Sequence, residues 1–386
     1  MKILFDAQAF DMQTHGGVSR SFVELYKHMP DNVMATFGVR ETDNVYLQSL
    51  DFPSAGYSYH NFISKRDFPL KKMFYKAYYN IAYGYPSRWD KRPFLNRYYS
   101  ERLIKEGNFD VFHPTYFDDY FLEILGEKPF VLTIHDMIPE LFPNYYPRND
   151  FQIIQKSKLV SLAKHIVAVS EHTKEDLVRL LNVPEDKVTV VYHGVDEATY
   201  VPTEQNELNF EYLLYVGDRK FYKNFMAFCQ ACIPIFKRHG DLKVICTGKP
   251  FDTEEMQFFR EKNVENRFVH HFVKAEQELM DLYHYAVAFV YPSAYEGFGI
   301  PILEAYKADC PVMLNRASCF PEIAGDAAVF FTIRNGKCDF GEQFEKLYYM
   351  TNDEREVLLN SQRQRMQKYS WSNSAKRLTD IYQRCT

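Results

Sequence analysis

Two glutamates flank a Gly-Phe-Gly turn in the stretch YPSAYEGFGIPILEA, with seven residues between Glu296 and Glu304. The preceding VAFVYPS is typical of a strand, the glycines let the backbone approach a ligand, and Pro301 suits the start of a helix. Backbone N–H groups at such a turn favour an anion such as a phosphate. We expect Glu304 in the first helical turn, accepting hydrogen bonds from vicinal hydroxyl groups, and Glu296 approaching the same ligand from another direction.

This spacing does not suit a glycosidase pair. The two carboxyl groups of a retaining glycosidase lie about 5 Å apart on either side of one bond, whereas Glu296 and Glu304 would contact different parts of one ligand. The alternative is that Glu304 only complements a helix dipole and Glu296 is a solvated loop residue. The intervening EGFG and Pro301 favour the ligand-binding interpretation.

A basic cluster follows another expected strand, in YLLYVGDRKFYKN. Arg219, Lys220 and Lys223 come just after Gly217. Cations at the carboxyl edge of a sheet suit a diphosphate, because they can stabilise the charge that develops on a leaving phosphate, and could replace a metal ion there. A solvated basic turn is the alternative. The position after an apolar strand favours the phosphate-binding interpretation.

The first half of the chain holds weaker candidates. Gly16 and Gly17 precede an amphipathic helix in MQTHGGVSRSFVELYKHM, which resembles a phosphate-binding loop without the dinucleotide or P-loop fingerprint. A plain turn would explain them equally well. FVLTIHD places His135 at the end of a strand, where a histidine can bond a sugar hydroxyl, shuttle a proton or simply satisfy nearby backbone. No HExxH-type spacing accompanies it, so we expect no metal site.

Short apolar β-rich runs alternate with helical patterns along the whole chain, which predicts an α/β protein with parallel sheets covered by helices. The first series is KILFDAQAF, FDVFHP, FVLTIHD, HIVAVS and VTVVYHG, and the second is YLLYVG, LKVICTG, RFVHHFV, VAFVYPS, PVMLN and AAVFF. The polar stretch 196–210 is the expected linker between them. Both halves are expected to be doubly wound, and ligands of such sheets bind beyond the carboxyl ends of the strands.

Composition narrows the class of protein. A chain of 386 residues exceeds what one core usually serves, so two domains are expected. The net charge of −5 argues against a nucleic-acid partner. Seven cysteines fit a reducing compartment, and Cys229 and Cys232 are expected to be buried structural thiols. No apolar run approaches the roughly 20 residues of a membrane span, and the N-terminus lacks a signal peptide, so a cytoplasmic protein is expected.

The chain resembles, over nearly its whole length, the retaining glycosyltransferases of family four, which have the GT-B fold. GGVSR, TIHD, VSEHTKEDL, VYHGVD and YVGDRKFYKN occur in the family's order, and residues 291–331 resemble its donor-binding signature. The resemblance implies two Rossmann-like doubly wound domains facing a central cleft. Residues 1–200 would bind the acceptor and residues 201–370 a nucleotide-sugar donor. A closing helix, 371–386, would pack back on the first domain.

The resemblance also implies a role for each residue of the signature. Glu304 would hold the ribose of the donor, and Glu296 would approach the donor sugar. The backbone of Phe298, Gly299 and Ile300 would serve the phosphate and the sugar.

Outside the signature, the resemblance implies further contacts. Arg219 and Lys223 would bind the diphosphate, His135 would contact the sugar, and Gly16 with Gly17 would form the N-terminal glycine loop. The family often has a longer gap between its arginine and its lysine. Lys220, which lies between the two, is therefore a competing candidate for the phosphate contact.

The activity implied is transfer of a hexose-type sugar from a nucleotide-diphosphate sugar to a glycan or lipid-linked acceptor, in cell-surface polysaccharide synthesis. No well-placed carboxylate nucleophile is evident, which favours retention by a front-face route in which the leaving diphosphate helps to deprotonate the acceptor hydroxyl. Neither a cofactor nor a metal is expected. The alternatives are another GT-B enzyme, such as an epimerase or a phosphorylase, and a non-catalytic nucleotide-sugar-binding protein.

The segment from Lys65 to Arg102 is dense in basic and aromatic residues. Such a segment can lie on an anionic membrane, with aromatic rings at the headgroup level, which would suit a lipid-linked acceptor at the inner face of the plasma membrane. The alternative is a helix pair with its tyrosines packed inside and its lysines in water.

Overall fold

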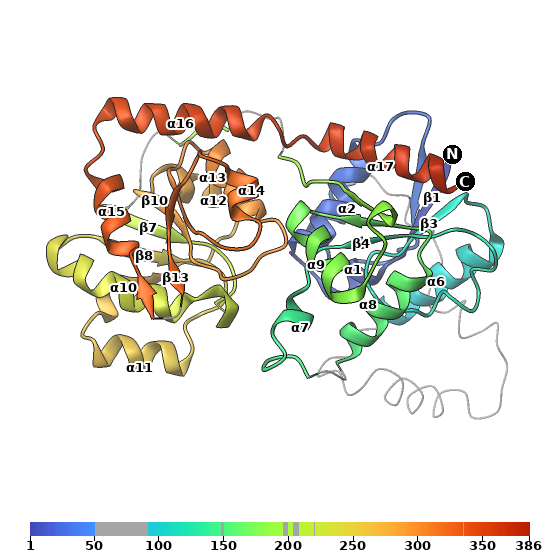
Figure 1. Cartoon of the computed structure of the whole chain (residues 1–386), viewed down its shortest axis with the longest axis horizontal. Coiled ribbons are helices and arrows are strands. Elements are labelled where there is room, and N and C mark those ends of the chain that lie inside the picture. The colour runs from blue at the N-terminus through green and yellow to red at the C-terminus, as the bar shows by residue number, and fades with distance from the viewer. Residues whose placement is uncertain (51–91, 148–149, 196–199, 204–207, 220, 335) are drawn as a thin grey trace. The chain divides into compact units, whose positions relative to one another are not determined.

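The computed structural model describes residues 1–50, 92–147, 150–195, 200–203, 208–219, 221–334 and 336–386 (Figure 1). Most of the expected linker 196–210 lies outside these ranges. Two compact units are present: residues 1–133, 154–165 and 379–386 form the first, and residues 134–153 and 166–378 form the second. Four of the described elements contribute residues to both: β4 (Val131–Ile134), α8 (Phe151–Leu162), β5 (His165–Ala168) and α17 (Trp371–Cys385).

The first unit contains a parallel sheet of order β2-β1-β3. Its strands are β1 (Lys2–Phe5), β2 (Met34–Phe37) and β3 (Val111–His113). The helices that accompany them are α1 (Gln8–Met12), α2 (Gly17–Lys27), α3 (Val45–Gln48) and α6 (Arg92–Glu106).

The ring of Phe5 anchors this unit, because it contacts Phe22 of α2 at 5.6 Å and Phe37 of β2 at 5.2 Å between centroids. The apolar runs for β1 and β3 are confirmed as strands. Strand β2 was not expected from the sequence. It lies at the edge of the three-stranded sheet, and Met34 is 65% exposed, so β2 lacks the continuous apolar run of a buried strand.

The second unit is built on a six-stranded parallel sheet of order β12-β11-β10-β7-β8-β9. The chain runs outward from β7 through β8 to β9, then returns beside β7 with β10 and continues outward to β12. The order therefore reverses between β7 and β10. The strands are β7 (Tyr212–Tyr215), β8 (Lys243–Cys246), β9 (Phe268–His270), β10 (Ala288–Tyr291), β11 (Val312–Asn315) and β12 (Val329–Phe331).

Helices cover both faces of this sheet, α12 and α13 on one and α10 and α11 on the other (Figure 1). Their bounds are α10 (Phe225–Arg238), α11 (Thr253–Glu261), α12 (Glu276–His284), α13 (Ile300–Lys307), α14 (Phe320–Ala324), α15 (Phe340–Tyr348) and α16 (Asn352–Met366). The unit also holds the parallel pair β5 (His165–Ala168) and β6 (Val188–Val190), the helices α7 (Ile138–Leu141) and α9 (Glu171–Leu181), and the hairpin β13 (Ile333–Arg334) and β14 (Lys337–Cys338).

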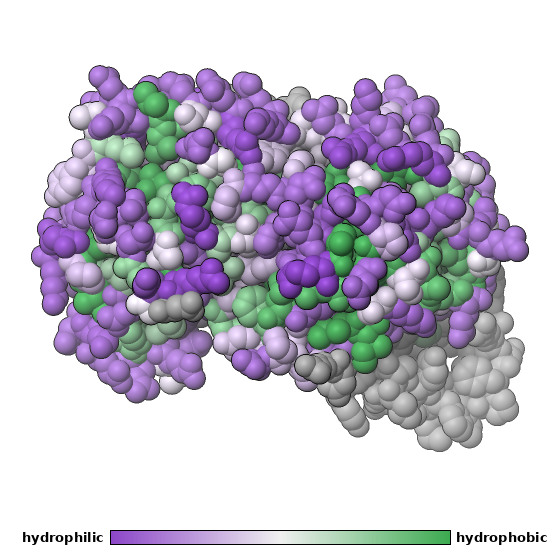
Figure 2. Space-filling model, in the orientation of Figure 1, coloured by the Kyte–Doolittle hydropathy of each residue, from purple (hydrophilic) through white to green (hydrophobic). Residues whose placement is uncertain are grey.

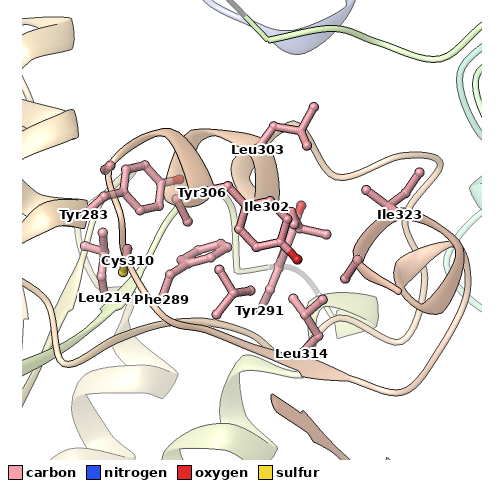
Figure 3. Packing of buried hydrophobic residues seen from close by; sticks show 14 of the residues in the cluster. Leu214, Tyr283, Phe289, Tyr291, Ile302, Leu303, Tyr306, Cys310, Leu314 and Ile323 are labelled. Carbon is pink, nitrogen blue, oxygen red and sulfur yellow. The ribbon is translucent and has the colours of Figure 1, made fainter. Parts of the chain in front are cut away.

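Alternate residues of each central strand enter different cores. Leu214 and Phe289 face the core under α13, and Leu213 and Ala288 face the core under α10. Figure 3 shows the first core, where side chains of the strands lie against Ile302 and others of α13. Each fully buried large apolar side chain stabilises the fold by about 1.5–3 kcal/mol. Burial on both faces explains why these strands are continuous apolar runs in the sequence.

The second core holds both cysteines of the CxxC pair. Cys229 and Cys232 lie on α10 and have no exposed surface. Burial raises the pKa of both thiols well above the usual value, so they stay protonated and pack as small apolar groups. The expectation of buried structural thiols is confirmed.

Hydrophobic side chains gather over the start of α8 on the face shown in Figure 2. On this helix Phe151, Ile154 and Leu162 are exposed to 60%, 54% and 54%. Their spacing places them on one side of the helix. Among the described residues, no helix is both long enough and apolar enough to cross a bilayer.

Candidate functional site

The loops after β7 and β10 meet where the strand order of the six-stranded sheet reverses, which is where doubly wound sheets bind ligands. The 3-10 turn η2 (Phe221–Lys223) ends the first loop, and the EGFG turn forms the second. Lys223 Nζ donates to Glu296 Oε1 at 2.5 Å, and the two side chains are only 14% and 11% exposed. Two of the predicted site residues are thus brought together as a nearly buried ion pair.

The EGFG turn leads into α13 as the sequence predicts. Gly299 takes the left-handed conformation (φ 95°) and caps α13, with Pro301 in the first turn. The N–H groups at the start of a helix have no acceptor within the helix, so this end can receive an anion. Phe298, Gly299 and Ile300, the predicted backbone contacts, lie at this end, beside the Lys223–Glu296 pair.

Glu304 requires a correction. The helix begins at Ile300, so Glu304 is its fifth residue and lies in the second turn, not the first. Its Oε2 atom accepts a hydrogen bond of 3.2 Å from the hydroxyl of Tyr283 on α12. The side chain is partly exposed.

Side-chain hydroxyl groups hold the EGFG turn in place. Ser318 Oγ accepts from the Glu296 N–H at 3.1 Å and donates to the Glu296 carbonyl at 2.6 Å. Ser170, the N-cap of α9, donates to the Gly297 carbonyl at 2.7 Å. Neither serine was singled out from the sequence, because an isolated serine carries no pattern.

Gly297 lies directly against His135, the residue that follows β4. A Cβ atom on Gly297 would come 1.7 Å from the carbonyl oxygen of His135. The turn can therefore approach this segment only with a glycine here. His135, predicted as a sugar contact, is placed beside the EGFG turn by this packing.

A second histidine, His193, lies under the ring of His135. The two rings are stacked with their centroids 5.8 Å apart, and His193 packs edge-on against Phe298 at 5.0 Å. Burial, helped by the neighbouring His135, lowers the pKa of His193 to about 3, so its ring is neutral. Sequence reasoning missed His193, although it lies near the end of the run VTVVYHG, as His135 lies near the end of FVLTIHD.

Arg219 is placed differently from Lys223. Its guanidinium donates to Glu255 on α11 at 2.7 and 3.1 Å and to the Pro250 carbonyl at 2.8 Å. The Arg219 and Glu255 side chains are only 6% and 7% exposed, and Phe225 and Phe251 lie beside the guanidinium. A carboxylate already opposes the charge of Arg219. As placed, Arg219 joins the loops after β7 and β8, and a contact with a diphosphate stays a prediction.

The remaining candidates belong to the first unit or lie outside the described residues. Gly17 begins α2 in the first unit, and the space a side chain on Gly16 would need is filled by Gln13, whose Oε1 atom accepts from the Ser19 N–H. Lys220 lies outside the described residues, as does the part of Lys65–Arg102 before residue 92. Among the residues that the structure describes, no group of three or more His, Cys, Asp or Glu side chains could hold a metal ion.

Family models match the chain in two consecutive parts. Residues 15–199 match the model described as Glycosyltransferase Family 4, and residues 198–370 match the one described as Glycosyl transferases group 1. A likeness in structure accompanies them: the crystal structure of Anabaena HepE in complex with UDP and glucose superposes with a TM-score of 0.70 at 14% identity, over 99% of each chain. At this identity the likeness shows the fold alone, and the expected GT-B class is confirmed.

Two curated relatives match about half of the chain. The O-antigen chain mannosyltransferase B of Escherichia coli is 30% identical over 213 residues, which is 52% of this chain and 56% of the relative. The O-antigen chain mannosyltransferase RfbU of Salmonella typhimurium is 26% identical over 219 residues, 53% of this chain and 61% of the relative. The matches therefore span less than two thirds of the length of either relative.

Proposed function

Because the chain belongs to the glycosyltransferases of family 4 and group 1, we propose that it moves a hexose-type sugar from a nucleotide-diphosphate sugar to a glycan or lipid-linked acceptor. The names of the two relatives, both O-antigen chain mannosyltransferases, support a role in cell-surface polysaccharide synthesis and a mannosyl donor. The solved relative with bound UDP and glucose supports a nucleotide-sugar donor.

One observation carries the proposal: Lys223, Glu296 and the N-terminus of α13 converge at the point where the strand order reverses. A cation and a helix N-terminus together suit a diphosphate. Glu296 beside them suits the hydroxyl groups of the donor sugar, and Glu304, one turn along α13, suits the ribose.

In the proposed reaction the donor diphosphate takes the place of Glu296 as the partner of Lys223. Lys223 and the N–H groups of α13 then stabilise the charge that grows on the diphosphate as the glycosidic bond breaks. Glu296, released from the ion pair, accepts hydrogen bonds from the donor sugar, and His135 contacts the same sugar. The leaving diphosphate helps to remove the proton of the acceptor hydroxyl on the same face, which gives retention.

A screen of UDP-, GDP- and ADP-sugars by thermal shift identifies the donor, because a ligand that binds only the folded state raises the midpoint of unfolding. Transfer to a glycoside acceptor, followed by NMR of the product anomer, then tests both the activity and retention. EDTA-treated enzyme is expected to keep its activity, since Lys223 supplies the charge at the diphosphate. Failure of every donor to shift the midpoint or to be consumed would contradict the proposed function.

The proposal includes association with a membrane surface at the inner face of the plasma membrane. The exposed apolar side of α8 supports it, since Phe151 and Ile154 are suited to the headgroup boundary. The basic and aromatic segment Lys65–Arg102, described only from residue 92 onward, would supply the attraction to anionic lipid.

A further inference from the structure

Two exposed aromatic rings lie face to face next to the residues of the candidate site. Phe221 begins η2, the turn that ends at Lys223, and Tyr145 follows α7. Their ring centroids are 3.3 Å apart and their planes differ by 3°. Phe221 is 50% exposed and Tyr145 is 47% exposed. Because the inner faces of the rings cover each other, the ring surface that remains open lies on their outer faces and edges.

Three further aromatic rings, those of Tyr222, Phe142 and Tyr295, connect this pair with the site. Tyr222, the next residue of η2, packs against Phe142 at 5.6 Å, and Phe142 packs against Tyr295 at 6.3 Å. Tyr295 directly precedes Glu296, is 5% exposed, and donates to Asp176 at 2.8 Å. The aromatic surface therefore continues from buried rings at the EGFG turn to the exposed pair.

These aromatic rings are held next to the charged residues Lys223 and Glu296. The Ala294 N–H donates to the Tyr222 carbonyl at 2.7 Å, which ties η2 to the loop after β10. The Nζ atom of Lys223 lies 5.3 Å from the centre of the Tyr222 ring. A ligand stacked on the pair would consequently be held by the same loops that position Lys223 and Glu296.

We propose that Phe221 and Tyr145 form a stacking subsite for a pyranose ring of the acceptor glycan, an inference that rests on the proposed function. One face of a pyranose is lined by C–H groups, and these are attracted to the negative face of an aromatic ring, while the hydroxyl groups remain at the rim. Ligand sites commonly combine such aromatic lining with a few polar groups.

The chemistry favours the acceptor over the donor at these rings. The diphosphate of the donor requires positive charge and N–H groups, which Lys223 and α13 supply. Its ribose is assigned to Glu304, which is bonded to Tyr283 of α12, whereas the ring pair belongs to η2 and the segment after α7. The donor sugar is assigned to Glu296 and His135. The neutral sugar of the acceptor is therefore the part that suits an uncharged aromatic surface.

The test compares Phe221→Ala, Tyr145→Ala and Phe221→Trp with the wild type, using the octyl glycosides of mannose, glucose and galactose as acceptor probes. We expect each alanine variant to raise the acceptor KM by about tenfold, the scale of losing one aromatic stacking contact. Phe221→Trp keeps a ring and is expected to stay within twofold of the wild type. Tyr349→Ala, at an aromatic residue that is 71% exposed at the end of α15, is the matched control.

Donor measurements separate this inference from its premise. The donor KM and the rate of donor hydrolysis without acceptor are expected to stay unchanged in the alanine variants. An acceptor KM that stays within twofold, or a donor KM that rises as much as the acceptor KM, overturns the subsite while transfer by the wild type stands. A wild type that neither binds nor consumes any nucleotide sugar overturns the proposed function and the subsite together.

Discussion

Lys223 and Glu296 form an ion pair with an N–O distance of 2.5 Å between two loops that belong to separate strands of one sheet. Both side chains are largely withdrawn from water, so each charge depends on the other for its stabilisation. A phosphate that arrives beside Lys223 can replace the carboxylate as partner. Under the proposed function, the pair keeps a cation and a hydrogen-bond acceptor at the same point until the donor binds.

Lys223→Ala is expected to lower turnover at saturating donor by about 100-fold or more, the scale of losing one preorganised charge contact with a leaving group. Steady-state kinetics at several donor concentrations measure the effect. Lys262→Ala, an exposed lysine at the end of α11, is the control. Adding Glu296→Gln to Lys223→Ala removes the carboxylate left without a partner, and turnover should stay low. Turnover equal to that of the wild type in Lys223→Ala would remove the proposed role.

Arg219 and Glu255 form a pair of a different kind, bidentate and almost completely buried. Removing either partner of a buried pair costs about 3–5 kcal/mol, because the other charge is left without compensation. Arg219→Ala and Glu255→Ala are therefore expected to lower the free energy of unfolding by similar amounts, measured by urea titration. The free energy of unfolding of the double variant should fall by less than the sum of the two single losses. A raised donor KM in Arg219→Ala with unchanged stability would instead support a direct contact with the diphosphate.

Gly297→Ala places a methyl group 1.7 Å from the carbonyl oxygen of His135. This oxygen belongs to the backbone, so it cannot move away as the end of a flexible side chain could. We expect a loss of about 1–3 kcal/mol in the free energy of unfolding, the usual cost of overpacking, and reduced turnover because the turn that bears Glu296 shifts. Gly240→Ala is the matched control, because a Cβ atom there meets no atom within 4 Å. Equal stability of the two variants would show that the turn does not pack on His135.

His193 gives the stability of the protein a pH dependence. In the folded chain its pKa is lowered to about 3, mainly by burial and to a smaller extent by repulsion from His135. In the unfolded chain its pKa is about 6.5. The unfolded state therefore binds the proton more tightly, and this contribution to stability is complete above about pH 6.5 and decreases as the pH falls toward 3.

We expect the free energy of unfolding to fall by up to about 1.4 kcal/mol per pH unit below pH 6. Urea titrations at pH 7, 6, 5 and 4 measure it. His193→Phe keeps a ring in the same place and should lack this part of the slope. The same slope in both proteins would show that His193 does not carry the effect.

Vesicles test the proposed contact with a membrane. Co-sedimentation with vesicles that contain anionic lipid is expected to weaken as salt is added, because salt screens the attraction to basic residues. The double variant Phe151→Ser and Ile154→Ser should reduce binding at low salt, since it removes exposed apolar surface from α8. Val357→Ser, at an apolar residue that is 67% exposed on α16, serves as the control. Absence of salt-sensitive binding by the unaltered protein would exclude the membrane interpretation.

Much of the fold could be predicted because buried parallel strands need apolar side chains on both faces. Leu213 and Leu214 enter two different cores and so appear as neighbouring apolar residues in the sequence. Strand β2 was missed for the same reason, since Met34 at its start faces water. The exact start of α13 was also missed, because the left-handed Gly299 caps a helix that begins at Ile300, one residue before Pro301, and Glu304 therefore lies in the second turn.

The sequence by itself determined the α/β class, the family resemblance and the positions of candidate residues after the strands, because these depend on local patterns and on neighbours along the chain. Only the tertiary structure decided how the charges are paired. Lys223 meets Glu296, and Arg219 meets Glu255, through contacts between separate loops. Such pairings depend on the order of strands in the sheet and on the packing of helices against it, and distance along the chain does not encode either.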